Sequence, residues 1–130
     1  MTLIEILNAS KGIDAFLSKR FVNFSVVREL VALKKKVKEE VEFYISEEKK
    51  IIEAYATRDE KGNPIILEGG RIQLKSAEDK EAFDKEILSL RNVEVDIKPV
   101  VINLSDFKSN EEFPTANEII EVEGFISIAE

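Results

Sequence analysis

One stretch of the chain, residues 25–56, contains no glycine and no proline, the two residues that most often interrupt a helix. Apolar side chains recur there in steps of three and four, which is the spacing of one face of an α-helix, and Glu48 fills the one missing place. The members of this stripe are Val26, Leu30, Leu33, Val37, Val41, Tyr44, Ile51 and Tyr55. The sequence therefore predicts one helix on the order of 45–50 Å long, at about 1.5 Å per residue.

A helix of this length exceeds the diameter of a compact domain of 130 residues, and the length of the chain predicts one domain over 1–130. Two arrangements would cover the stripe. In the first, an amphipathic helix predicted at 3–17, loosened near Ser10–Gly12, packs on the stripe as an intramolecular hairpin. In the second, the near-heptad repeat forms a coiled coil with another copy of the chain. The first helix is too short to cover the whole stripe, so we expect self-association and take the stripe as a candidate interaction surface.

The remaining segments predict shorter elements of both kinds. A turn at 61–64 is followed by a β-hairpin over 65–74, folded around Gly69-Gly70. Further elements are a helix that begins after Ser76, a strand over 93–97, an extended segment over 100–104, and a short helix that begins at the capping box Thr115–Glu118. Phe125, Ile126 and Ile128 are expected to tie the C-terminal end to the core. This order predicts a helix-predominant α+β fold in a single domain, without internal repeats or a linker.

The chain contains no cysteine and no histidine. The first absence excludes disulfides, thiolate metal sites and cysteine nucleophiles, and the second removes the commonest general base and the commonest metal ligand. The formal net charge is −7, which is unfavourable for phosphate backbones and anionic membrane surfaces. The start of the chain lacks the basic residues of a secretory signal, and no apolar run has the length of a membrane span. We therefore expect a cytoplasmic protein without a nucleic-acid or membrane partner.

Any catalytic site would have to use carboxylates, lysine, serine or tyrosine. The densest acidic clusters are Glu39-Glu40-Glu42, Glu47-Glu48 and Glu78-Asp79-Glu81. All three lie on predicted helices as solvated faces, whereas catalytic carboxylate pairs are buried or held in a cleft that separates their pKa values. The segment Asp59–Asn63 lacks the alternating ligands of a calcium loop. We expect no enzyme, no catalytic, cofactor or metal site and no small-molecule ligand. An active site built from acids of several elements stays open as a third alternative.

Two segments carry a family resemblance. These are EAYATRDEKGNPI (residues 53–65), at the end of the long helix, and DKEAFDKEILSLRNVEVDI (residues 79–97), after a short variable hairpin. Over residues 20–104 the chain resembles an uncharacterised family of small bacteriophage and prophage proteins. The resemblance implies a phage- or prophage-encoded protein in the cytoplasm of a bacterial host, or one incorporated into the virion, and it assigns no residue a role.

Together these features predict a non-enzymatic phage accessory protein that acts through protein–protein contacts, as an assembly factor, a chaperone or a small structural component. Its expected partners are a second copy of the chain and a phage or host protein. The alternative is an inhibitor of a host defence or nucleic-acid enzyme, in which the acidic surface imitates nucleic acid.

Overall fold

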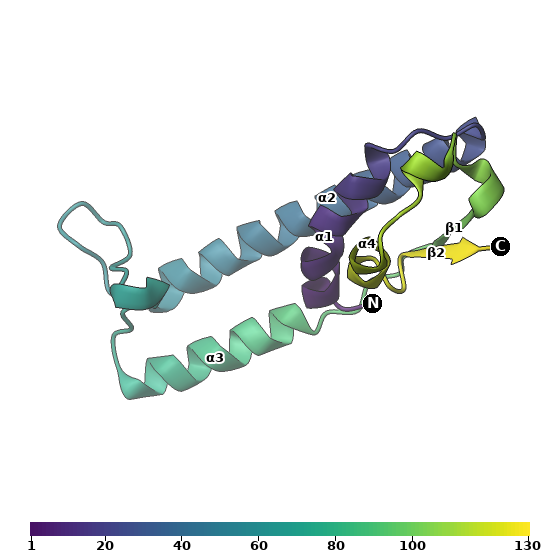
Figure 1. The fold of residues 1–130 in the computed structure, drawn as a ribbon. Coiled ribbons are helices and arrows are strands. Elements are labelled where there is room, and N and C mark those ends of the chain that lie inside the picture. The colour runs from purple at the N-terminus through teal and green to yellow at the C-terminus, as the bar shows by residue number, and fades with distance from the viewer. The chain divides into compact units, whose positions relative to one another are not determined.

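The computed structural model describes all 130 residues. Helices predominate, accompanied by one small sheet, so the predicted α+β class is confirmed (Figure 1). The helices and strands are α1 (Leu3–Leu17), α2 (Phe24–Tyr55), α3 (Ala77–Arg91), β1 (Val100–Asn103), α4 (Ala116–Glu121) and β2 (Ile126–Ala129). Three single turns of 3₁₀-helix lie at Glu68–Gly70, Leu104–Asp106 and Asn110–Glu112. The long predicted helix is α2, which begins one residue before and ends one residue before the predicted range of 25–56.

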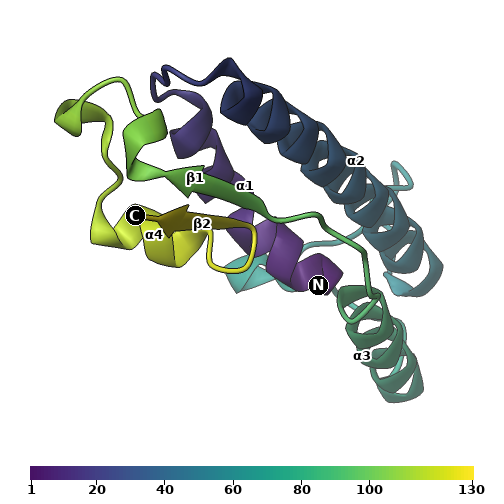
Figure 2. The same ribbon diagram turned by 90° about the vertical axis from the view of Figure 1, so that its right-hand side faces the viewer.

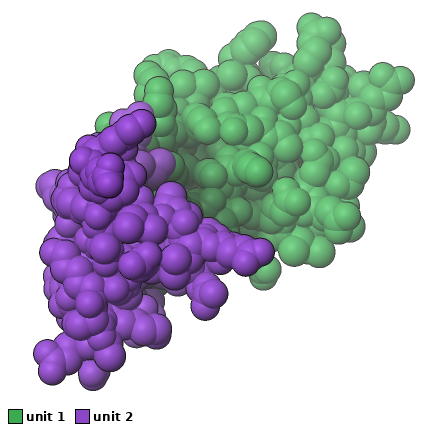
Figure 3. All heavy atoms as spheres, turned by 90° about the vertical axis from the view of Figure 1, so that its left-hand side faces the viewer, with its two compact units in different colours: residues 1–41, 94–130 green, residues 42–93 purple.

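The contacts within the chain divide it into two compact units, where the sequence predicts one domain (Figure 3). Unit 1 contains Met1–Val41 and Glu94–Glu130, and unit 2 contains Glu42–Val93. Helix α2 contributes residues to both units, since the boundary falls between Val41 and Glu42. Unit 1 is therefore built from both ends of the chain, and unit 2 is continuous in sequence.

Helix α1 of unit 1 is unbroken, so the expected loosening near Ser10–Gly12 is wrong. A reciprocal capping box between Thr2 and Glu5 starts the helix. Gly12 lies buried in mid-helix, where a Cβ atom would come within 2.9 Å of Glu121 Cβ and Val122 Cγ1. The glycine thus permits close packing of α1 against α4 and its C-terminal end, rather than marking a break in the helix.

The sheet of unit 1 has two parallel strands, in which Val100 pairs with Ile126 and Ile102 with Ile128. A crossover that includes α4 joins the strands, as parallel pairing requires. The side chains of Val100, Ile102 and Ile126 are buried in the core, whereas Val101 and Ser127 are exposed on the opposite face. The strand predicted over 93–97 is wrong. Only Thr2 and Glu94 form a single antiparallel bridge there, because the chain enters α1 directly after Thr2.

Unit 2 combines the C-terminal part of α2 with α3, which runs alongside it (Figure 1). Between the helices the chain folds back through single antiparallel bridges rather than continuous strands. These bridges pair Ala56 with Leu74, Arg58 with Pro64, and Ile66 with Ile72. The last pair lies on either side of Gly69-Gly70, where the hairpin was predicted. Ser76 accepts a hydrogen bond from Asp79 N–H at the start of α3, so the predicted cap is confirmed.

Candidate functional site

Most residues of the predicted interaction stripe are covered by other elements of the same chain. Its first four members, Val26, Leu30, Leu33 and Val37, are buried in the core of unit 1, and Val41 packs against that core. The other three belong to unit 2, where Tyr44 is buried and Ile51 and Tyr55 are half-buried. The chain's own elements therefore cover most of the stripe. Self-association stays a prediction, and the stripe leaves little free surface for it.

Two stripe residues of unit 2 have specific partners on α3. Arg91 Nε donates a hydrogen bond of 3.4 Å to Tyr44 Oη, which raises the pKa of Arg91. The ring of Tyr55 meets the ring of Phe83 edge-on, with 6.3 Å between the centroids. Both contacts join α2 to α3, so these tyrosines act as packing residues of unit 2.

The acidic clusters on α2 and α3 do not converge on a common point. No group of three or more carboxylates lies close enough to hold a metal ion. Two members pair with lysines of their own helix, Glu40 with Lys36 at 3.1 Å and Glu47 with Lys50 at 3.0 Å. The lysines of both pairs are exposed while Glu40 is only 18% exposed, and such pairs within one helix contribute a few tenths of a kcal/mol.

Unit 2 contains an open pocket of about 420 Å³ between α2, α3 and the loop before α3. Its apolar lining includes Ile52, Phe83 and Ile87. Three of its five charged residues have partners, since Lys80 pairs with Asp84 at 3.0 Å and Arg91 bonds Tyr44, whereas Glu48 and Arg71 form no ion pair. The pocket therefore offers only Glu48 and Arg71 as free charged groups that could fix the orientation of a ligand.

Unit 1 has a groove of about 310 Å³ between α2 and residues 96–100. Leu33, Ile97 and Val100 are among its apolar lining residues. Its charged residues are two acids, Glu29 and Asp96, and two bases, Lys36 and Lys98, so its charge is balanced. The groove therefore has neither a charge preference nor a set of converging polar groups.

A second groove of unit 1, of about 340 Å³, runs between α4 and β2. We call it the α4–β2 surface, and its lining residues are Ile119, Ile120, Glu123, Gly124, Ile126, Ser127 and Ile128. Ile120 is 66% exposed and Ile119 is 40% exposed, although both are large apolar residues on one short helix. In the view of Figure 2, β2 lies between β1 and α4. This surface thus places unpartnered isoleucines beside a strand at the edge of the sheet.

The edge of β2 that faces away from β1 is open beyond Ile126 N–H, which donates to Val122 O at 3.0 Å. Val100 N–H donates to Phe125 O at 2.9 Å, and a parallel ladder alternates, so the backbone groups of Ser127 point to β1. The N–H and C=O of Ile128 consequently point to the opposite edge. No other backbone segment and no side chain bonds to Ser127, Ile128 or Ala129. Such an edge is a ready template for another extended chain.

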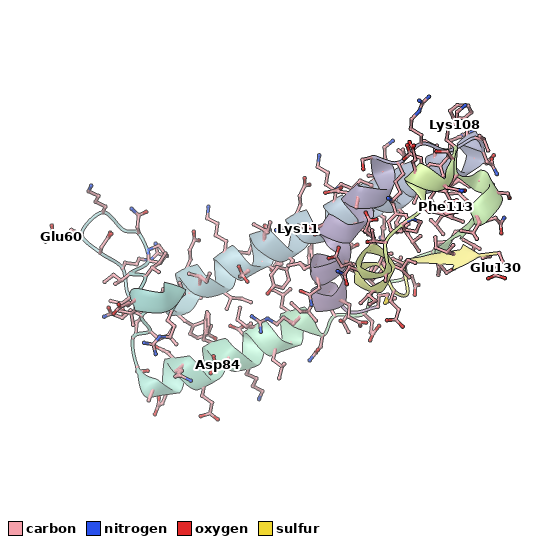
Figure 4. The ribbon with its side chains drawn as sticks, in the orientation of Figure 1. Lys11, Glu60, Asp84, Lys108, Phe113 and Glu130 are labelled. Carbon is pink, nitrogen blue, oxygen red and sulfur yellow. The ribbon has the colours of Figure 1, made fainter.

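The part of the sequence that forms this surface is acidic and has no basic residues. From Ser109 to the end the chain contains no lysine or arginine, and its carboxylates are Glu111, Glu112, Glu118, Glu121, Glu123 and Glu130. Glu121, Glu123 and Glu130 are exposed and form no ion pair. Figure 4 labels Glu130 where the chain leaves β2. The surface is therefore apolar in its groove and acidic at its margins.

Glu118 differs from these free acids because it holds α4 to the end of α1. Its carboxylate accepts a hydrogen bond from Thr115 N–H at 2.9 Å. It also forms an ion pair with Lys19 Nζ at 3.1 Å. The Thr115 N–H first, and then Lys19, lower the pKa of Glu118 below its ordinary value. Glu118 thus positions α4 and leaves Ile119 and Ile120 on the outer side.

The sequence contained a signal for the α4–β2 surface that helical periodicity does not use. Residues 109–130 contain acidic residues interleaved with isoleucines and no basic residue, whereas α2 carries charges of both signs. The strand itself had no comparable signal, since β2 has four residues and pairs with a segment far away in sequence.

The chain matches no protein-family model, and no curated protein or solved structure matches it. None of its helices combines the length and the apolar character needed to cross a lipid bilayer.

Proposed function

We propose that this chain is a non-enzymatic accessory protein that binds another protein through the α4–β2 surface. One observation carries the proposal: two exposed isoleucines lie beside an unpaired strand edge within an acidic margin. Large apolar groups that gather beside unsatisfied backbone groups are typical of protein-binding sites. The action in a phage or prophage context, as an assembly factor, a chaperone or a small virion component, is part of the proposal and rests on the sequence resemblance.

The test is quantitative affinity capture from bacterial cells that carry the phage or prophage, with two matched variants. Ile120→Lys alters the α4–β2 surface, and Ile66→Lys alters an isoleucine of unit 2 with the same exposure of 66%. We expect Ile120→Lys to reduce the yield of one specific captured protein by about tenfold or more, since residues at the centre of an interface dominate its affinity. Ile66→Lys should leave the yield unchanged.

Circular dichroism and thermal melting would first confirm that both variants are folded. A captured protein whose yield is the same from the wild type and from Ile120→Lys would contradict the proposed surface. Equal loss with both variants would also contradict it, because the effect would then follow from the added charge and not from its place.

The inhibitor of a host defence or nucleic-acid enzyme is the second candidate, and the run of acids from Glu111 to Glu130 favours it. An acidic mimic competes with nucleic acid for one basic site. If this candidate is right, excess duplex DNA should displace the captured protein at low salt. Retention of the captured protein under DNA would favour the assembly role instead.

A further inference from the structure

The backbone of β2 offers hydrogen-bonding groups that the chain itself does not satisfy. Ile128 turns its N–H and C=O away from β1, and Ile126 turns its C=O to the same side. Ile126 N–H is already bonded to Val122 O at 3.0 Å, which fixes the start of the strand beside α4. These open groups are spaced as in a regular parallel strand, so an extended chain could continue the ladder.

The groove beside this edge fits the side chains of such an added strand. Successive side chains of a strand point to opposite faces, so every second one would turn toward α4. Ile119 and Ile120 lie there as exposed apolar groups in the same groove as Ile126 and Ile128. An α-helix in the groove would cover the isoleucines but leave the Ile128 backbone groups unpaired. The open edge therefore favours an extended occupant.

The charge at the margins selects the chemistry of the occupant. Glu123 lines the groove, Glu121 precedes it on α4, and Glu130 follows β2, all exposed and without an ion pair. A second copy joined through β2 would bring the same carboxylates together, and like charges across an interface are unfavourable. A segment that carries lysine or arginine would instead pair with them.

We propose that β2 accepts an extended basic segment of a partner protein as a third strand, with its apolar side chains on Ile119 and Ile120. The strand β2 is four residues long, so the occupant needs about four to six residues that alternate between apolar and basic. This inference rests on the proposed function and names the partner's chemistry at the same surface.

The probe is a short acetylated and amidated peptide of alternating lysine and valine, titrated against the whole chain. A peptide of alternating glutamate and valine serves as the charge control. A lysine–valine peptide N-methylated at every residue serves as the backbone control, since it lacks all the donors that a ladder requires in either strand direction. We expect the unmodified basic peptide to bind at least about tenfold more tightly than either control.

Amide hydrogen exchange reports the mode of binding directly. In the free protein we expect Ser127 N–H, bonded to β1, to exchange slowly and Ile128 N–H to exchange fast. Saturation with the basic peptide should slow Ile128 N–H by about tenfold or more and leave Ser127 N–H unchanged. Ile120→Lys should weaken binding of the peptide by about tenfold, and Ile66→Lys should not.

Equal binding of the basic and acidic peptides, or unchanged exchange of Ile128 N–H in the saturated complex, would overturn the inference. The two proposals fail differently. If capture from cells depends on Ile120 but exchange of Ile128 N–H stays fast in the peptide complex, the binding surface is retained and strand addition is rejected. Capture that does not depend on Ile120 would reject the proposed function as well.

Discussion

Lys19 and Glu118 lie 99 positions apart in sequence and form an ion pair of 3.1 Å between Nζ and Oε1. Lys19 follows the end of α1, and Glu118 lies in the first turn of α4. Both side chains are largely buried, with exposed fractions of 12% and 25%. The pair therefore ties the helix that carries Ile119 and Ile120 to the N-terminal part of unit 1.

This pair predicts a defined pH dependence. The folded-state pKa of Glu118 is lowered, so its stabilising effect is complete above the unfolded value of about 4.5. The effect is lost as the pH falls through the lower folded-state pKa. We expect Glu118→Gln to lower the free energy of unfolding at pH 7 by about 1 kcal/mol and to reduce the loss of stability on acidification.

Urea unfolding of wild type and Glu118→Gln between neutral and acid pH would measure the difference. Glu121→Gln is the matched control, because Glu121 is exposed on the same helix and has no ion pair. Wild-type and Glu118→Gln stabilities that stay parallel down to the lowest pH would contradict the assignment.

Gly12 predicts an effect opposite to that of helix propensity. Alanine is usually preferred to glycine inside a helix by about 1 kcal/mol. At this position a Cβ atom would come within 2.9 Å of Glu121 Cβ and Val122 Cγ1. We therefore expect Gly12→Ala to destabilise unit 1 by about 1–3 kcal/mol, because α4 would have to move away. Thermal melting checks this, with the exposed neighbour Lys11→Ala as the control, and a stabilised Gly12→Ala would contradict the close packing.

The burial of Val37 separates the two roles considered for the stripe. Val37 is fully buried and Ile45, on another face of α2, is 57% exposed. As a core residue, Val37→Ala should lower stability by about 2 kcal/mol, and Ile45→Ala by less than about 0.5 kcal/mol. The melting temperature of the wild type should then be independent of protein concentration.

Light scattering at tens of micromolar tests the self-association predicted from the sequence. A melting temperature that rises with concentration, together with a larger particle, would support a coiled coil through the stripe. A strict monomer would leave the stripe with its packing role alone.

Asp106 is the one buried charged residue of the chain, and we expect its replacement to lower the stability of the fold. Its Oδ1 accepts from Asn23 Nδ2 at 3.1 Å, and its Oδ2 accepts from Asn103 N–H at 2.9 Å. Asp106→Ala should cost about 2 kcal/mol, because both donors lose their partner. The exposed Asp96→Ala should be near neutral by the same denaturant titration. Equal losses of stability for Asp106→Ala and Asp96→Ala would contradict this role, because water would then satisfy both donors.

Local patterns allowed the helices to be predicted. The apolar spacing and the absence of Gly and Pro placed α2 to within one residue, and the side chains of Ser76 and Thr115 marked the starts of α3 and α4. The outcome at Gly12 could not be predicted, because the sequence does not show that α4 lies against it. The strand predicted over 93–97 alternated as expected and still lacked a partner of sufficient length.

The candidate surface was harder to predict for the same reason. The stripe on α2 is apolar whether its partner is the same chain or another, and sequence does not separate these cases. Ile126 and Ile128 were expected to contact the core, which is confirmed, but their pairing with β1 depends on residues about 26 positions away. An open edge exists only once that pairing is known.

The discontinuous make-up of unit 1 has a consequence for synthesis. Unit 2 consists of residues 42–93 alone, so all the residues that it needs are synthesised before residues 94–130 of unit 1. The N-terminal helices must wait for Phe125 and Ile126 before their core closes. Contacts of such large sequence separation slow folding. The apolar face of residues 1–41 would therefore stay exposed until the C-terminal strand is available. A chaperone that binds exposed apolar surface would act in this period.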